Sequence, residues 1–331
     1  MRIINLVENE MGETGCEAAH GLSFYVETKN HKLLFDTSPS ELVLRNAQKL
    51  GVDLTAVDTV ILSHGHYDHS GGILPFVEIN PRAKIYMQSN AGGDYYAFDS
   101  CGGLKPDCNT SGENKTPLTD SGVLYGEDKG YRYIGIDKKI LSSPQVQLLK
   151  GDTKIDDELQ LFTVDNRTFP LPSTNKRLRQ LCGGQYIQDE FHHEQNLLLT
   201  ADGNKILFCG CAHNGILNVM ETLERKFGKD MLPDLVIGGF HLMKRTEFSE
   251  ADTAEVTEIA NRLKGYKSHF ATCHCTGLPV FNQMKEIMGE QLSYVRSGDE
   301  VVVEITKPSE CHISNGLHLQ SLTQLFTKIL K

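Results

Sequence analysis

The chain contains no tryptophan, and its 33 lysine and arginine residues stand against 43 acidic residues, for a formal net charge of −10 and a pI of about 5.7. So acidic a chain is a poor general binder of nucleic acid or of membrane surfaces, and we predict neither as a partner. Residues 1–6 lack the apolar core of a signal peptide, and no apolar run reaches membrane-spanning length. Nine cysteines are an odd number. These absences predict a cytoplasmic protein with reduced thiols and no disulfide framework.

What the chain does contain is an alternation of strand-like and helix-like segments. Apolar runs predict strands at 2–7, 22–27, 32–37, 57–62, 83–87, 131–136, 159–164, 196–200, 206–209, 234–237 and 301–305, and another that ends at residue 274. Helical periodicity predicts helices at about 39–50, 71–79, 215–227, 251–263 and 278–288, the first of them capped by Ser38 with Pro39 at its first position. This rhythm is typical of an α/β protein.

Two regions depart from that rhythm. From about residue 91 to 130, Gly, Asp, Ser, Asn and Pro dominate the composition. We predict that residues 91–190 form an inserted small α+β element that covers the active site. Residues 307–331 are predicted to be a C-terminal extension with a helical stretch at 319–330, so the main domain would span residues 1–306.

Four side chains that can bind metal follow the apolar strand at 57–62. They are His64, His66, Asp68 and His69, three imidazoles and a carboxylate within six residues. Neutral imidazole and carboxylate are good ligands for zinc, and iron or manganese accept them too. Gly65 and the Gly71-Gly72 pair permit the tight backbone that such a loop needs. The alternative interpretation is a polar surface loop.

Three more histidines each lie just past a predicted strand: His213, His241 and His274. Ligand sites in α/β proteins gather beyond the carboxyl ends of strands. Taken singly, each histidine is more often a capping or surface residue. Their shared placement predicts that they converge with the first cluster on one site.

The pattern H-x-H-x-D-H at the end of an apolar strand resembles the metallo-β-lactamase superfamily. That resemblance implies a four-layer αββα sandwich with a one- or two-metal site at one edge of the sheets. The segments 20–23, 63–72, 210–216, 238–242 and 274–277 narrow the resemblance when they are taken as a set and in order. They look like the branch that includes 7,8-dihydropterin-6-methyl-4-(β-D-ribofuranosyl)-aminobenzene-5′-phosphate synthase, although that branch tends to have Glu where this chain has Ala19.

The resemblance implies the roles of individual residues. His64, His66 and His213 would hold one divalent metal ion, and Asp68, His69 and His274 the second, with Asp68 also catalytic. The usual bridging aspartate of the superfamily falls at Cys211, whose thiolate could bridge or simply pack, and Glu194 is another candidate ligand. His192 and His193 would be either extra ligands or surface substitutions. His20 and His241 would bind substrate or move protons, with a supporting hydrogen-bonding role as the alternative.

Three functions remain open at this stage. The first is a hydrolase that uses two divalent metal ions, Zn²⁺ or else Mn or Fe, on a small anionic substrate with a phosphate or diphosphate group. The second is a pterin-type synthase, a transferase that displaces diphosphate. The third is a non-catalytic or redox-sensing metal-binding protein, suggested by Cys209, Cys211, Cys273 and Cys275 beside the predicted ligands. A homodimer is left open.

Overall fold

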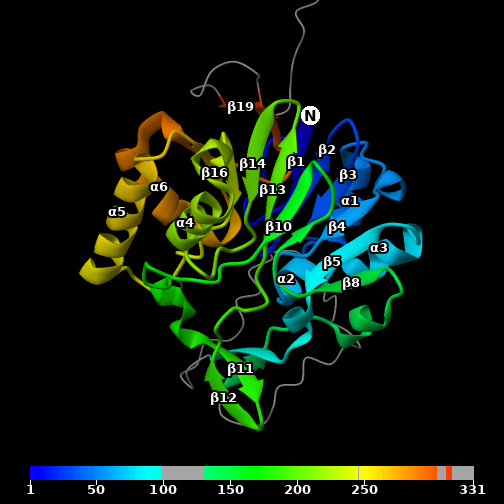
Figure 1. Ribbon diagram of the computed structural model, residues 1–331, viewed down its shortest axis with the longest axis horizontal. Coiled ribbons are helices and arrows are strands. Elements are labelled where there is room, and N and C mark those ends of the chain that lie inside the picture. Colours follow the sequence, from blue (N-terminus) through cyan, green and yellow to red (C-terminus); the bar gives the residue numbers. More distant parts are fainter. Residues whose placement is uncertain (99–129, 245, 304–310, 315–331) are drawn as a thin grey trace, which may run out of the picture.

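The computed structural model describes residues 1–98, 130–244, 246–303 and 311–314. Two large β-sheets pack face to face, and helices cover the outer face of each sheet (Figure 1). This arrangement is the α/β sandwich of four layers, αββα, that the sequence predicts.

The first sheet has the strand order β19-β18-β1-β2-β3-β4-β5-β8. Its strands are β1 (Arg2–Val7), β2 (Ser23–Glu27), β3 (Lys32–Phe35), β4 (Thr59–Ile61), β5 (Lys84–Gln88), β8 (Val146–Leu149), β18 (Glu300–Val303) and β19 (Cys311–Ser314). Strands β3, β4, β5 and β8 run parallel, so their carboxyl ends meet at one edge.

The second sheet has the order β17-β16-β15-β14-β13-β10-β9. Its strands are β9 (Thr153–Lys154), β10 (Leu159–Phe162), β13 (Asn196–Ala201), β14 (Asn204–Phe208), β15 (Leu235–Gly238), β16 (His269–Thr272) and β17 (Leu292–Tyr294). Strands β14 to β17 are parallel, which brings the ends of β14, β15 and β16 together. The residues that follow those three ends include His213, His241 and His274.

Side-chain alternation along the strands builds three apolar layers. Phe24 and Val26 of β2, with Ile206 and Phe208 of β14, point into the core between the sheets. Tyr25, between the first two, points instead to the outer face of its sheet. The outer layers hold helices α1 (Leu42–Lys49) and α3 (Ile73–Ile79) on the first sheet, and α4 (Ile216–Phe227), α5 (Glu250–Lys264) and α6 (Leu278–Met288) on the second.

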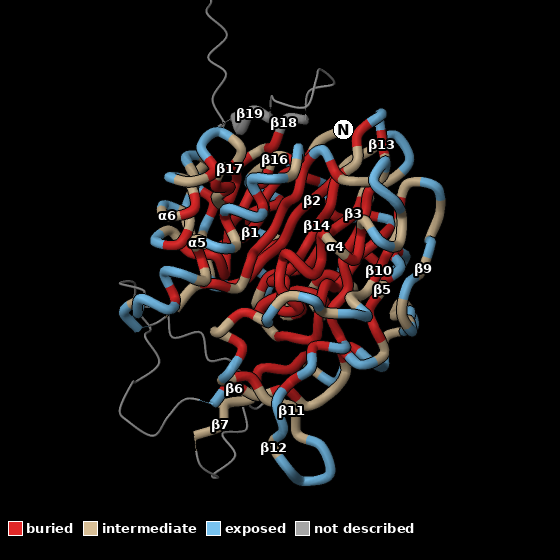
Figure 2. Tube along the Cα trace, turned by 60° about the vertical axis from the view of Figure 1, so that its left-hand side comes forward, coloured by how far each residue is buried: buried red, intermediate tan, exposed pale blue. Residues whose placement is uncertain are grey.

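A separate four-stranded sheet lies below the sandwich in Figure 1, and we name it the accessory sheet. Its order is β12-β11-β6-β7, with β6 (Tyr95–Phe98), β7 (Tyr131–Tyr133), β11 (Leu178–Cys182) and β12 (Gln185–Gln188). Figure 2 shows buried residues concentrated in the sandwich, while the tip of the β11–β12 hairpin is exposed.

Short helices complete the described elements. They are α2 (Tyr67–Ser70) and the 3₁₀ helices η1 (Leu54–Ala56), η2 (Ser89–Gly92), η3 (Lys138–Ser142), η4 (Ser173–Arg177), η5 (Lys229–Met231), η6 (His274–Thr276) and η7 (Gly289–Gln291). Among the described residues, none of the helices combines the length and the apolar character needed to cross a membrane.

The structure corrects the predicted start of the first long helix. Helix α1 begins at Leu42 with Glu41 at its N-cap, and Ser38 does not cap it. Ser38 has a φ of 66°, outside the helical range, and its backbone N–H donates to the carbonyl of Leu22. Contact with the chain just before β2 therefore holds this segment out of the helix.

The β11–β12 hairpin is an element that sequence reasoning missed. Its turn is Gly183-Gly184, and both glycines have positive φ (56° and 82°). A Gly-Gly pair between two strand-like runs is a recognised signal for this kind of tight turn, so the signal was present.

Only parts of residues 91–190 belong to the accessory sheet. Strands β8, β9 and β10 fall inside that range and join the two sandwich sheets instead. The most polar part of the predicted insertion and the predicted helix at 319–330 lie outside the described residues. The domain limits therefore stay a prediction. The six cysteines whose side chains are described are all unpaired.

Candidate metal centre

The H-x-H-x-D-H motif occupies the loop after β4 and the single turn of α2. His66 is the N-cap of α2 in extended conformation (φ −109°, ψ 150°), and Asp68 and His69 lie within the turn. Gly65 is required by close packing, because a Cβ there would lie 2.5 Å from the carbonyl oxygen of Ala91. The loop therefore turns tightly and buries all four chemical side chains of the motif.

The first group of predicted ligands converges as expected. Ring nitrogens of His64, His66 and His213 lie within 4.8 Å of one another. The Nε2 atoms of His64 and His213 are 3.3 Å apart. Nε2 of His66 is buried and has no hydrogen-bond partner among the described residues. Because an unpaired buried nitrogen is costly, this arrangement fits a cation among the three imidazoles.

The second group also converges. Oδ2 of Asp68 lies 3.8 Å from Nε2 of His69 and 3.6 Å from Nε2 of His274. The two imidazole nitrogens are 3.2 Å apart. The structure thus brings together both sets of side chains that the resemblance assigns to two metal ions.

Hydrogen bonds on the far side of each ring decide which nitrogen carries the proton. Nδ1 of His69 donates to Oδ2 of Asp36 (2.6 Å), and Nδ1 of His274 donates to Oδ1 of Asn9 (2.9 Å). Nδ1 of His213 donates in the same way to Oδ1 of Asn175 (3.0 Å).

His64 follows the same rule through one more residue. Its Nδ1 donates to Oγ of Ser63 (2.8 Å), whose hydroxyl donates to Oδ2 of Asp36 (2.7 Å). The Nε2 atoms of these four histidines point away from those partners, and they lie close together in two pairs, His64 with His213 (3.3 Å) and His69 with His274 (3.2 Å). Such outer partners are how proteins orient imidazole ligands toward a metal.

The electrostatics favour neutral imidazoles at the centre. Burial, followed by repulsion from neighbouring histidines, lowers the pKa well below the ordinary value at His64, His66, His213 and His274. Burial would also lower the pKa of His69, but the carboxylates of Asp36 and Asp68 outweigh it and raise that pKa. Neutral imidazole is the form that coordinates a metal ion, so the first four rings are ready to do so near neutral pH.

Cys211 lies between the two groups, whereas Glu194 does not. Sγ of Cys211 is 3.2 Å from Nε2 of His69 and within 4.8 Å of a ring nitrogen of His64. Both carboxylate oxygens of Glu194 instead accept backbone N–H bonds, from His213 (2.6 Å) and from Asn214 (2.9 Å). Of the two candidate extra ligands, Cys211 is the one within reach of both groups, and Glu194 holds the His213 loop.

His192 and His193 differ from each other. His192 is exposed. His193 is buried, and its Nδ1 accepts the backbone N–H of Gly65 (2.9 Å) while its Nε2 contacts Oδ2 of Asp189 (3.1 Å). Both ring nitrogens of His193 therefore have partners, and the residue supports the loop that carries the H-x-H-x-D-H motif.

His20 and His241 lie at the rim of the centre. Nε2 of His20 is 3.5 Å from Oδ2 of Asp68, with the side chain 45% exposed. The His241 ring is 4.1 Å from the His213 ring, and neither of its nitrogens has a hydrogen-bond partner among the described residues. Its backbone has a φ of 49°, a strained conformation of the kind that concentrates at functional sites.

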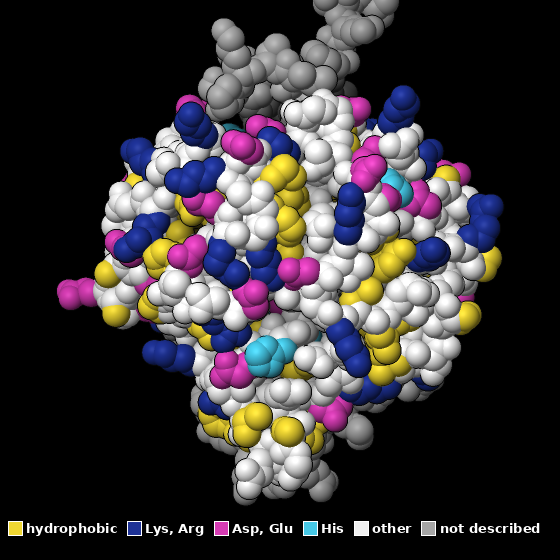
Figure 3. All heavy atoms as spheres, in the orientation of Figure 1, with side chains coloured by type: hydrophobic (Ala, Val, Ile, Leu, Met, Phe, Trp, Pro, Cys, Tyr) yellow, Lys and Arg dark blue, Asp and Glu magenta, His cyan; other side chains and the backbone are white. Residues whose placement is uncertain are grey.

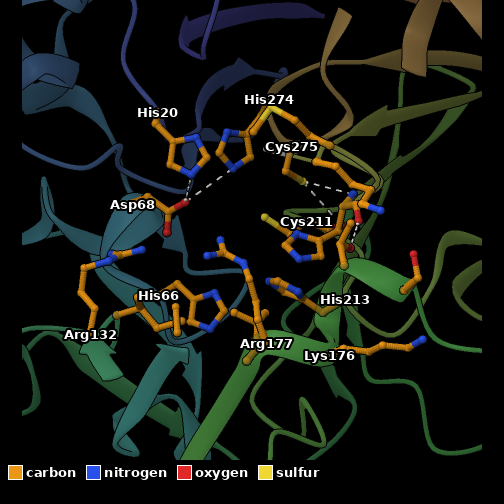
Figure 4. A pocket seen from close by; sticks show the side chains of 18 of the residues that line it. His20, His66, Asp68, Arg132, Lys176, Arg177, Cys211, His213, His274 and Cys275 are labelled. Carbon is orange, nitrogen blue, oxygen red and sulfur yellow. Dashed lines mark hydrogen bonds and ion pairs between the residues drawn. The ribbon is translucent and has the colours of Figure 1, made fainter. Parts of the chain in front are cut away.

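A cavity of about 400 Å³ opens directly onto these side chains (Figure 4). On the face of the molecule drawn in Figure 3, basic and acidic side chains are interspersed. The sandwich side of the lining supplies His20, His66, Asp68, Cys211, His213, His241, His274 and Cys275. The lining also includes four basic residues, Arg132, Lys176, Arg177 and Lys244, the last of which is paired with Asp252, and Asp68 is the only carboxylate among the lining residues described. The cavity is therefore suited to an anion in spite of the acidic chain.

Several supporting residues were not predicted. Asp36 follows a strand end just as the predicted ligands do, so a signal for it existed in the sequence. Asn9, Asn175, Arg132 and Arg177 lie in short or irregular segments whose placement depends on tertiary contacts. Nothing in their local sequence distinguishes them.

Comparison with known proteins gives a consistent picture. Residues 17–92 match the family model described as the metallo-beta-lactamase superfamily. In Methanocaldococcus jannaschii, 7,8-dihydropterin-6-methyl-4-(beta-D-ribofuranosyl)-aminobenzene-5'-phosphate synthase is 27% identical over 311 residues, 90% of this chain and 95% of that protein. The uncharacterized protein MJ0448 of the same organism is 26% identical over 278 residues, 82% of this chain and 89% of its own length.

A solved structure agrees with the sequence matches. Tm1679, described as a metal-dependent hydrolase of the beta-lactamase superfamily, superposes with a TM-score of 0.69 at 25% identity. The superposition covers 92% of this chain and 99% of that one. The likeness therefore extends well beyond the segment that the family model matches.

Proposed function

We propose, on the premise that this chain belongs to the metallo-β-lactamase superfamily, that it is a hydrolase with two divalent metal ions that acts on a small phosphate- or diphosphate-containing substrate. The observation that carries the proposal is the pair of adjoining ligand groups at the floor of a cation-lined cavity. Four imidazoles there are oriented by hydrogen bonds at Nδ1, so that their Nε2 atoms point toward the centre.

His64, His66 and His213 would hold one ion, Asp68, His69 and His274 the other, and Cys211 would be shared. Imidazole, carboxylate and thiolate together suit Zn²⁺ best, and Mn or Fe accept most of the same donors. When bound, the ions supply Lewis acidity that polarises a phosphoryl oxygen and lowers the pKa of water toward neutrality.

The chain's own residues then position the reactants. Oδ2 of Asp68 lies 3.5 Å from Nε2 of His20 at the mouth of the cavity. Burial, and then the positive charge of Arg177, lower the pKa of His241 to about 3, so its ring is a neutral imidazole near neutral pH. A neutral imidazole on the cavity wall can accept a proton or a hydrogen bond from the substrate or from the attacking water.

The test is zinc-dependent release of 4-nitrophenol from 4-nitrophenyl phosphate and from bis(4-nitrophenyl) phosphate. The wild type is expected to turn over at least one of them, and His213→Ala to lose that activity because the first ion loses a ligand. His192→Ala is the matched control, since that histidine is exposed, and it should behave as wild type. Release from wild type that does not exceed the His213→Ala background would contradict hydrolysis.

A second candidate function is a synthase in which an aryl carbon or amine displaces diphosphate from a pterin-methyl substrate. It is favoured by the 27% identity to a protein with a synthase name over 90% of this chain. Both reactions would place phosphoryl oxygens at the same centre and differ in the nucleophile admitted. Diphosphate release that requires pterin and amine together, with no release from simple esters, would favour the synthase.

A further inference from the structure

Two arginines, Arg132 and Arg177, line the cavity onto which the ligand groups open. In Figure 4 both guanidinium groups reach into the pocket, whereas the side chain of Lys176 runs away from it.

Arg132 is held in place by strand pairing. It pairs with Ala97 of β6, and Ala97 pairs on its other side with Leu178 of β11. All three residues line the cavity, so they share the face of the accessory sheet that looks toward the metals. The small Ala97 side chain between the larger two leaves room over the middle of that face.

The strand that carries Arg132 is also fastened to the metal motif itself. A β-bridge joins His66 to Gly135, and the backbone N–H of Tyr67 donates to the carbonyl of Ile134 (2.9 Å). Arg132 therefore sits only two residues before a segment that hydrogen-bonds to the metal loop, and its backbone is fixed relative to the metals.

Arg177 is fastened to the second half of the centre. It ends η4, and Asn175 of that helix both donates to the carbonyl of His213 (2.7 Å) and accepts from its Nδ1 (3.0 Å). Thr174, in the same turn, donates its hydroxyl to the carbonyl of His241. Because η4 is hydrogen-bonded to His213 and His241, the backbone of Arg177 is held in place relative to the centre.

We propose that Arg132 and Arg177 form a second anion site, which binds a phosphoryl group of the substrate other than the one at the metal ions. The planar fork of arginine matches phosphate oxygens and keeps its charge at every physiological pH. Ile134, Leu178 and Met243 supply apolar wall for the organic part of the ligand. The inference rests on the proposed function, and it makes the substrate one with at least two phosphoryl groups.

The experiment compares methylphosphonate with α,ω-alkane bisphosphonates of one to six methylene groups, titrated calorimetrically into zinc-loaded protein. The measured quantity is the ratio of the two dissociation constants for the best chain length. Arg132→Gln, Arg177→Gln and the double variant remove the arginines. Arg179→Gln is the matched control, because that half-buried arginine hydrogen-bonds to Lys176, Leu178 and Gln188 and does not line the cavity.

The wild type and Arg179→Gln are expected to prefer the bisphosphonate by at least about tenfold more than the double variant does, because the double variant loses the hydrogen bonds between charged groups that hold the second phosphoryl group. Short bisphosphonates also chelate zinc, but chelation is common to all variants and cancels in the comparison. An unchanged preference in the double variant, or an equal loss in Arg179→Gln, would overturn the second site.

Methylphosphonate alone reports on the proposed function. If it binds wild type no better with zinc than without, the metal centre does not hold phosphoryl groups, whatever the arginines do. If it binds only with zinc and the second phosphoryl group adds nothing that depends on the arginines, the proposed function stands and the second anion site is wrong.

Discussion

The sandwich edge that carries the candidate ligands and the accessory sheet face each other across one cavity, and they are built in opposite ways. At the edge, the ligand side chains are buried and most are held by a specific partner such as Asp36 or Asn9. On the other side, the half-buried Arg132 of β7 and Arg177 at the end of η4 present long cationic side chains to the cavity. The difference separates two tasks, since fixed ligands suit metal chemistry and long charged side chains suit recognition of a substrate.

The two regions are nevertheless joined. Asn175 belongs to η4, which leads into the accessory sheet, yet it hydrogen-bonds to His213 on the sandwich side. The bridge between His66 and Gly135 is a second joint. Substitutions at these two contacts should therefore weaken metal binding. Substitutions that remove the guanidinium groups of Arg132 and Arg177 should weaken only substrate binding.

The largest effect is expected at the sandwich edge. Asp68→Ala should abolish phosphate-ester turnover. The loss should exceed the roughly 10–100-fold decrease that is typical when a residue that only supports a metal ligand is removed. The fold should stay largely intact, because Asp68 lies at the cavity rather than in an apolar core. Steady-state kinetics with metal analysis checks this. Wild-type turnover with a full metal complement in the variant would show that Asp68 is not a ligand.

At the joint, Asn175→Ala should weaken metal binding by about 10–100-fold, as removal of an outer hydrogen bond to a ligating histidine typically does. The loss should fall on one ion, because Asn175 contacts His213 and neither Asp68 nor His274. Competition with a fluorescent zinc chelator measures it. Lys176→Ala, at the neighbouring residue, is the control. An equal loss of zinc affinity in both variants would contradict a specific role of Asn175 in holding His213.

The Cys211→Ser variant tests whether the Cys211 thiolate binds both metal ions or whether the thiol only packs against its neighbours. In cobalt-substituted wild type, a thiolate ligand gives an intense near-ultraviolet charge-transfer absorption, which the serine variant should lose while it keeps its cobalt. We expect turnover to fall by about tenfold, since the hydroxyl is a poorer donor. Cys182→Ser, at an exposed and distant thiol, is the control. No such absorption in wild type would mean that Cys211 only packs.

The smallest effect is expected at the opposite end of β3 from the metal edge. His31 contacts Asp58 (2.9 Å) and Asp156 (2.8 Å), and so ties the start of β3 to the β9–β10 turn. Burial alone would lower the pKa of His31, but the two carboxylates outweigh it and raise that pKa. The stabilisation is therefore complete below the unfolded-state pKa of about 6.5 and is lost as pH rises through the higher folded-state pKa.

Urea unfolding of His31→Gln at pH 5.5 and pH 8.5 tests this sign. The variant should be less stable than wild type by about 1 kcal/mol at the lower pH and by less at the higher pH. His192→Gln, at an exposed histidine, should show no such trend. A stability difference that grows toward pH 8.5 would contradict the ion-pair account.

The same contrast explains how much could be read from the sequence. His64, His213 and His274 follow apolar strands, and parallel strands bring their carboxyl ends together, so local pattern plus one topological rule predicts their meeting. Arg132 sits in a three-residue strand and Arg177 in a 3₁₀ turn. Their place near the candidate ligands depends on contacts between segments far apart in the chain, which no local sequence period encodes.

The choice between the two candidate extra ligands also could not be predicted from the sequence. From sequence alone, Cys211 and Glu194 are both candidate extra ligands, and Cys211 could instead simply pack. They are separated by which backbone N–H groups the Glu194 oxygens meet, at residues 213 and 214. Whether the Glu194 oxygens reach these N–H groups depends on the exact path of the loop, which residue type and spacing do not predict.

The central claim is that two ligand groups hold two ions, and metal content tests it most directly. Wild-type protein reconstituted with zinc and freed of loosely bound metal should contain two equivalents by elemental analysis and native mass spectrometry. His213→Ala and His274→Ala should each keep one, because each removes a ligand from a different group. A wild-type content of one ion or fewer after reconstitution would contradict the account.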